Sequence, residues 1–174
     1  MRNDPKRTPL RLCLAAVLAA LALMLAACTP AYDSIADQLL ADTQKQADQE
    51  LLRLENLAMI IDRLTQSSAA DDCQALANAK TQASYASNMD FYDNLQSSLL
   101  VLDARMTAMP DLSTPKLTDA LSQLEKNAGE VRTSHATQNF LSADYLKASR
   151  QVLDQQFRAL TVYELTIRGG GQPQ

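Results

Sequence analysis

The residues of this sequence with the greatest capacity for chemistry are one histidine, His135, and three cysteines. A histidine can act as a general base, as the partner of a nucleophile or as a zinc ligand, and each role needs another polar group close by. No Asp, Glu or Cys stands three or four residues from His135 along the chain. The sequence therefore predicts a partly buried, hydrogen-bonded imidazole, with a metal ligand or a general base as the alternative.

Cys73 follows two acids, Asp71 and Asp72. Two carboxylates beside a thiol could bind a metal ion, but acids at the start of a helix are also favoured by the helix dipole. A small buried core residue is the simplest interpretation of Cys73, and a contact or disulfide with a partner is the alternative. The chain has no Gly-rich phosphate loop, CxxC, HExxH or GxSxG pattern. We expect neither enzyme activity nor a metal or cofactor.

Three aromatic residues, Tyr85, Phe91 and Tyr92, cluster beside the poorly helical pair Ser87-Asn88. Aromatics make up only 5% of the chain, so such a cluster stands out. Core packing is one interpretation, and a patch that contacts a protein partner is the other, because interfaces favour aromatic side chains.

The elements that must position these residues are predicted to be helices. The chain has no Trp, and it has neither Gly nor Pro between residues 31 and 109. A β-sheet protein would need turn residues within such a length. The sequence predicts an all-α fold, an antiparallel bundle of three to four long amphipathic helices.

Caps and breaks give the expected bounds of these helices. The first runs over 34–65, the second over 68–106 with a weak point at Ser87-Asn88, and the third begins at Pro115 with Thr114 as its N-cap. The last is capped by Ser142 and ends at Arg168, and a break near 138–141 is favoured over one bent helix. The predicted core stripes repeat at three and four residues. They comprise Leu40, Ala47, Leu54, Leu57, Ile61 and Leu64; Leu76, Ala79, Ala83 and Met89; Leu95, Leu99, Leu102 and Met106; Leu117, Leu121, Leu124, Ala128, Val131 and His135; and Leu146, Leu153, Phe157 and Leu160.

The N-terminus has a pattern of its own. A basic segment over 2–11 precedes an apolar run of about 16 residues, short of the roughly 20 that span a bilayer. The run ends in Leu25-Ala26-Ala27-Cys28, which resembles the lipobox of bacterial lipoproteins. This resemblance implies cleavage between Ala27 and Cys28, and a diacylglycerol and an N-acyl chain such as palmitate on Cys28.

The resemblance also implies a domain organisation. Residues 1–27 would be a lipoprotein signal peptide, 28–33 a short linker from the lipidated Cys28, 34–168 the helical bundle, and 169–174 a disordered tail. Thr29, where an Asp would favour the inner membrane, implies the periplasmic face of the outer membrane if the host is Gram-negative.

The net charge of the chain limits the classes of partner that it can bind. The net charge is −4, and without the leader it falls to about −7 because four basic residues and one acid leave with it. So acidic a domain argues against nucleic acid and against electrostatic binding to anionic lipid. We expect a cell-envelope lipoprotein that contacts the membrane through its lipid and acts as a non-catalytic scaffold, adaptor or accessory subunit for protein partners. The alternatives are a helical binder of a small molecule or lipid, and an exclusion or immunity lipoprotein.

Overall fold

A computed structural model of the chain describes residues 34–67, 72–108 and 114–168. All regular structure in these residues is helical, and no strand occurs among them, which confirms the all-α prediction. The proposed leader with Cys28, the linker and the tail lie outside the described residues. The helices are α2 Ser34–Thr65, α3 Asp72–Ala83, the 3-10 turn η1 Ala86–Asn88, α4 Met89–Thr107, α5 Pro115–Gln138 and α6 Ala143–Arg168.

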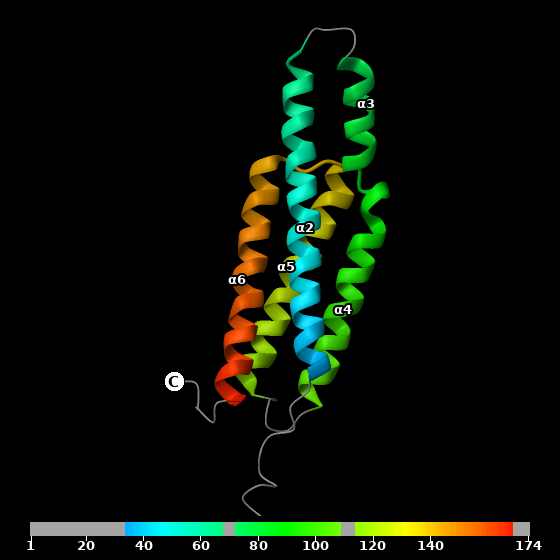
Figure 1. Cartoon of the computed structure of the whole chain (residues 1–174). Helices are drawn as coiled ribbons and strands as arrows, with labels where there is room; N and C mark the ends of the chain where they lie inside the picture. The colour runs from blue at the N-terminus through cyan, green and yellow to red at the C-terminus, as the bar shows by residue number, and fades with distance from the viewer. Residues whose placement is uncertain (1–33, 68–71, 109–113, 169–174) are drawn as a thin grey trace, which may run out of the picture. The chain divides into compact units, whose positions relative to one another are not determined.

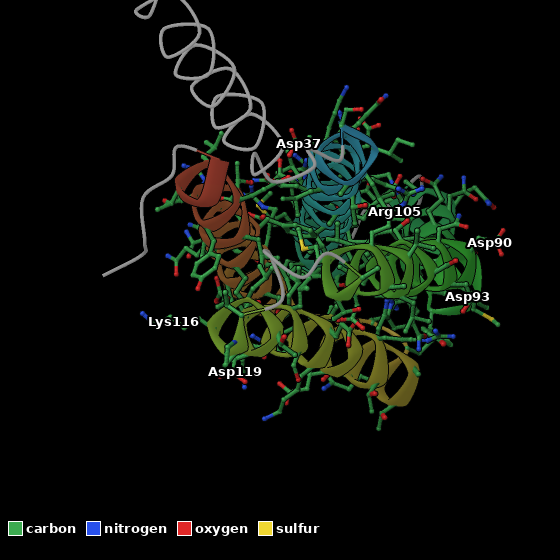
Figure 2. The ribbon with its side chains drawn as sticks, turned by 90° about the horizontal axis from the view of Figure 1, so that it is seen from below. Asp37, Asp90, Asp93, Arg105, Lys116 and Asp119 are labelled. Carbon is green, nitrogen blue, oxygen red and sulfur yellow. The ribbon has the colours of Figure 1, made fainter. Side chains whose placement is uncertain are left out.

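Four of the helices enclose the core. Helix α2 packs against α4 and α6, and α5 packs against the same two helices from the other side. Seen along their axes in Figure 2, the four surround a layer of side chains, while charged residues such as Asp90 and Asp119 point outward. Because each helix repeats apolar residues at three and four positions, one face of each turns inward. The largest fully buried side chains are Tyr92, Phe157, Leu40, Leu51, Leu54, Leu99, Leu102, Met106, Leu121, Leu124, Leu146 and Leu160.

Helix α3 has a different environment. The C-terminal part of α2 and all of α3 extend past the junction between α5 and α6, where they pair with each other (Figure 1). Only Ala79 and Ala83 of α3 are buried, and neither belongs to the main core cluster. With a single neighbouring helix, apolar residues predicted to be buried here are half-exposed, as Ile61, Leu64 and Leu76 show.

The helix predicted over 68–106, with a possible interruption at Ser87-Asn88, is two helices, because it is interrupted between Ala83 and Met89. The interruption falls at the predicted weak point. There the Ser84 and Ser87 hydroxyls each lie 2.8 Å from the Thr81 carbonyl oxygen, and such side-chain bonds compete with the helical ladder. Met89, predicted to be buried, is 43% exposed because α4 begins with a new phase.

The ends of the other helices follow their caps. Thr114 has an extended backbone and its hydroxyl accepts a hydrogen bond from the Leu117 amide, with Pro115 at the first helical position. Helix α5 ends at Gln138, and its C-cap Asn139 has a φ of 60°, in the left-handed region. Ser142 then accepts from the Tyr145 amide at 3.2 Å and starts α6, so the expected break between these helices is present.

Candidate functional site

His135 lies at the centre of a buried polar chain. Its side chain is 1% exposed, with Nδ1 2.8 Å from the Tyr92 hydroxyl and Nε2 2.9 Å from the Ala83 carbonyl oxygen. A carbonyl oxygen can only accept, so Nε2 carries the proton and Nδ1 accepts from Tyr92. Burial lowers the pKa of His135 and favours this neutral form. The prediction of a hydrogen-bonded imidazole is confirmed, and its burial is more complete than expected.

Asn88 fixes the joint between α3 and α4. Its Nδ2 donates to the carbonyl oxygens of Gln82 and Ser84, at 2.9 and 2.7 Å, while its Oδ1 accepts from the Arg53 guanidinium of α2. The Asn88 side chain is 2% exposed, so water cannot reach its amide group and these protein hydrogen bonds satisfy it. Sequence reasoning missed this role, although the low helix propensity of Ser87-Asn88 marked the position.

The structure brings the three aromatic residues together, but in the core. The ring centroids of Phe91 and Tyr92 are 4.8 Å apart, and those of Tyr85 and Tyr92 are 5.9 Å apart. Phe91 is 7% exposed and Tyr92 is 2% exposed, so neither offers a surface to a partner. The alternative of core packing holds for both. Tyr85 is half-buried, and its hydroxyl accepts from Nε of Arg132 at 3.3 Å.

Cys73 is a free, exposed thiol near the start of α3. Its interpretation as a small buried core residue is wrong, because α3 packs on one helix and buries only two alanines. Exposure leaves the predicted contact with a partner open to it. Its neighbour Asp71 and the predicted cleavage and lipidation residues Ala27 and Cys28 lie outside the described residues.

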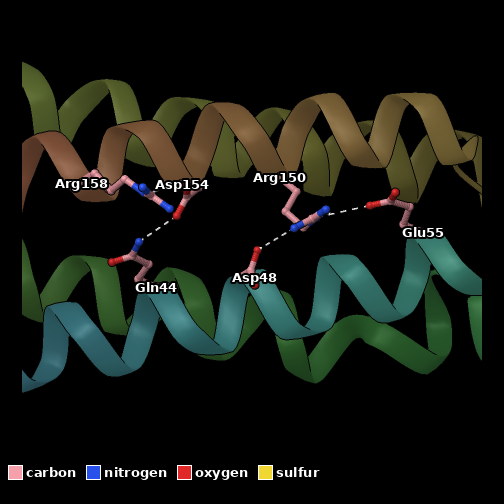
Figure 3. A network of polar contacts seen from close by, with 6 residues as sticks. All are labelled: Gln44, Asp48, Glu55, Arg150, Asp154 and Arg158. Carbon is pink, nitrogen blue, oxygen red and sulfur yellow. Dashed lines mark hydrogen bonds and ion pairs between the residues drawn. The ribbon is translucent and has the colours of Figure 1, made fainter.

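A second polar network joins α2 to α6 (Figure 3). Arg150 donates from Nη1 to Asp48 at 3.0 Å and from Nε to Glu55 at 3.3 Å. The Glu55 side chain is only 11% exposed, and Arg150 is its ion-pair partner across the two helices. Asp154 of α6 extends the network by accepting from Nε2 of Gln44 at 2.9 Å. These bonds set the register of the two helices.

A slot opens between α4 and α5. It is a cavity of about 120 Å³, with an apolar wall that includes Leu95 and Leu99 of α4 and Ala128 and Gly129 of α5. A carboxyl group, that of Glu125, belongs to the same lining. The slot runs beside the predicted core stripes, so sequence reasoning did not find it.

One rim of the slot carries an arginine whose three guanidinium nitrogens each have a partner in the protein. Arg132 pairs with Asp93 at 2.6 Å and donates to Gln96 Oε1 at 2.7 Å, in addition to its bond with Tyr85. The hydrogen bond to Tyr85 raises the pKa of Arg132. The positive charge of Arg132 is therefore paired with the Asp93 carboxylate of the protein itself.

In residues 34–67, 72–108 and 114–168, no group of three or more His, Cys, Asp or Glu is placed to hold a metal ion. None of the helices described there combines the length and apolarity that crossing a membrane requires. No protein-family model, curated protein or solved structure matches the chain.

Proposed function

We propose that this chain is a membrane-anchored lipoprotein of the bacterial envelope whose helices form a non-catalytic antiparallel bundle that binds a protein partner. The observation that carries the proposal is Leu25-Ala26-Ala27-Cys28, at the end of an apolar run behind a basic N-terminus. Each buried methylene of an acyl chain contributes about 0.8 kcal/mol, so two or three chains on Cys28 hold the protein on a membrane. Only residues 29–33 separate Cys28 from α2, which keeps the helices near the bilayer.

The outer face of α2 supports a partner-binding role. Leu52 and Met59 are 39% and 48% exposed, at a spacing of seven residues that places them on one side of the helix. A shallow hollow of about 350 Å³ beside them is lined in part by Leu52, Leu57 and Ile60. Apolar side chains grouped on an otherwise polar helix face are typical of protein interfaces. We assign this face to the partner in place of the buried aromatic cluster.

The anchor is tested by Cys28→Ser, with Cys73→Ser as the matched control. Cells are fed an alkyne analogue of palmitate, and the chain is assayed for label and for fractionation with membranes after a high-salt wash. We expect Cys28→Ser to lose the label and leave the membrane fraction, and Cys73→Ser to keep both. A Cys28→Ser chain that stays with the membrane after the wash would contradict the lipoprotein assignment.

The binding face is tested by a photo-crosslinking amino acid at Leu52 or Met59 in intact cells. Gln123, exposed on α5, is the control position. We expect one discrete adduct, of the same partner, from both α2 positions and none from Gln123. Absence of an adduct at both α2 positions, or the same adduct at Gln123, would remove this face from the proposal.

A further inference from the structure

Gly129 of α5 lies at the exposed edge of the slot between α4 and α5. A Cβ built at this glycine meets no atom within 4 Å, so no close backbone contact requires glycine here. Glycine inside a helix destabilises it by comparison with alanine. At this exposed position, the lack of a side chain leaves the edge of the slot open.

The size of the slot suits a small apolar group. Its volume of about 120 Å³ compares with the roughly 150 Å³ of a cavity that holds a benzene ring. Leu95, Leu99 and Ala128 supply apolar surface, and they are 4%, 2% and 7% exposed. A single ring or a short hydrocarbon can therefore be buried against them.

Glu125 gives the slot its polar end. Its Oε1 is shielded from solvent and has no hydrogen-bond partner in the described part of the chain. Burial raises the pKa of Glu125, and the charge of Asp103 raises it further. A shielded carboxyl group beside a second acid favours a ligand that brings a positive charge and N–H donors. The arginine at the other rim does not reverse this preference, because Asp93 already balances its charge.

We propose that the slot between α4 and α5 binds a small apolar ammonium compound, whose ammonium group pairs with the Glu125 carboxylate and whose hydrocarbon contacts Leu95, Leu99 and Ala128. This inference goes beyond the proposed function. It holds or fails without regard to lipidation of Cys28 or to a partner on α2.

The test titrates benzylamine into the full chain in mild detergent and follows backbone amide resonances by NMR. For a ligand of this size we expect a dissociation constant of about 0.1 to 1 mM, with shifts centred on Leu99, Ala128 and Gly129. Benzoate, with the opposite charge, is expected to bind at least about 10-fold more weakly. Phosphoethanolamine carries the same ammonium group on a lipid-headgroup skeleton without the hydrocarbon, and it is also expected to bind at least about 10-fold more weakly.

Three variants separate binding from folding. Gly129→Leu places a bulky side chain at the edge of the slot and should abolish the shifts, while its melting temperature stays equal or rises because leucine has the higher helix propensity. Gly129→Ala should keep binding within about 3-fold, and Glu125→Gln should weaken it about 10-fold. Unchanged binding in Gly129→Leu or Glu125→Gln, or no shifts with benzylamine, would overturn the proposal. Equal binding of benzoate would exclude the ammonium requirement, and equal binding of phosphoethanolamine would assign the site to a lipid headgroup.

Discussion

The change Tyr92→Phe tests whether the buried chain through His135 holds α3, α4 and α5 together. It removes one hydroxyl without altering the ring that packs against Phe91. The hydroxyl donates to His135 Nδ1 at 2.8 Å, and both side chains are at most 2% exposed. Without it, Nδ1 remains a buried acceptor that lacks its donor.

The expected loss follows from that unsatisfied acceptor. Removing one partner of a buried hydrogen bond costs about 1 to 3 kcal/mol. For a domain of this size, 2 kcal/mol corresponds to a melting temperature lower by about 6 to 10 °C. The matched control is Tyr163→Phe, whose hydroxyl lies 2.8 Å from the Thr114 hydroxyl in a partly exposed setting. Water can replace that bond, so we expect a loss of about 0.5 kcal/mol.

The assay is urea unfolding of the full chain in mild detergent, followed by far-UV circular dichroism at about pH 8, where His135 is neutral. Nitrogen NMR of the imidazole adds an independent readout, because the structure requires the proton on Nε2. If Tyr92→Phe loses no more free energy of unfolding than Tyr163→Phe, the buried bond does not stabilise the fold. A proton on Nδ1 would contradict the assigned chain of donors.

Three further predictions concern charge and local stability. Burial lowers the pKa of His135 below its usual value of about 6.5, so the unfolded chain binds more protons than the folded chain at low pH. The free energy of unfolding should therefore fall as the pH drops below about 6.5, and His135→Gln should show a smaller fall between about pH 7 and pH 5. An equal fall in the two proteins would contradict a buried, neutral His135. Arg150→Met should cost about 1 to 3 kcal/mol in urea unfolding because it strands the Glu55 carboxylate, and Glu55→Gln in the same chain should recover part of that loss; full additivity of the two changes would exclude the coupling. Amide hydrogen exchange should be faster in α3 than in α4, since α3 buries two alanines and α4 buries six side chains; equal protection would show that α3 shares the stability of the core.

The helices could be predicted closely from the sequence where local chemistry and packing agree. The first helix was expected over 34–65 and occupies Ser34–Thr65, and Thr114 with Pro115 marked the start of α5. The predicted core stripes of α5 and α6 are all buried, whereas that of α2 omitted Leu51 and Met89 of α4 is exposed. The stripes predicted too many buried residues beyond the α5–α6 junction, because periodicity predicts which face of a helix is apolar and not whether a second helix covers that face.

The candidate site was less predictable, for two physical reasons. The partners of His135 come from α4 and from the end of α3, about 43 and 52 residues away along the chain, and no local spacing encodes such contacts. The slot depends on how α4 and α5 pack, and the exposed Gly129 at its edge adds no periodic signal to the sequence. The prediction that Cys73 is buried was inferred from its residue type. Cys73 is exposed because no helix in the described part of the chain packs over its side of α3.

The position of His135 explains how a helix as weakly buried as α3 is held in place. Helix α3 ends at Ala83, where the last carbonyl groups of a helix lack internal partners. His135 donates to the Ala83 carbonyl, and Asn88 donates to those of Gln82 and Ser84. Two buried side chains thus satisfy the end of α3 that faces the core, although its own apolar contacts are few. Nε2 carries a proton in both charge states of His135, so its bond to Ala83 survives protonation of the ring. Protonation instead removes the acceptor at Nδ1, which couples proton binding in the core to the contact with Tyr92 of α4.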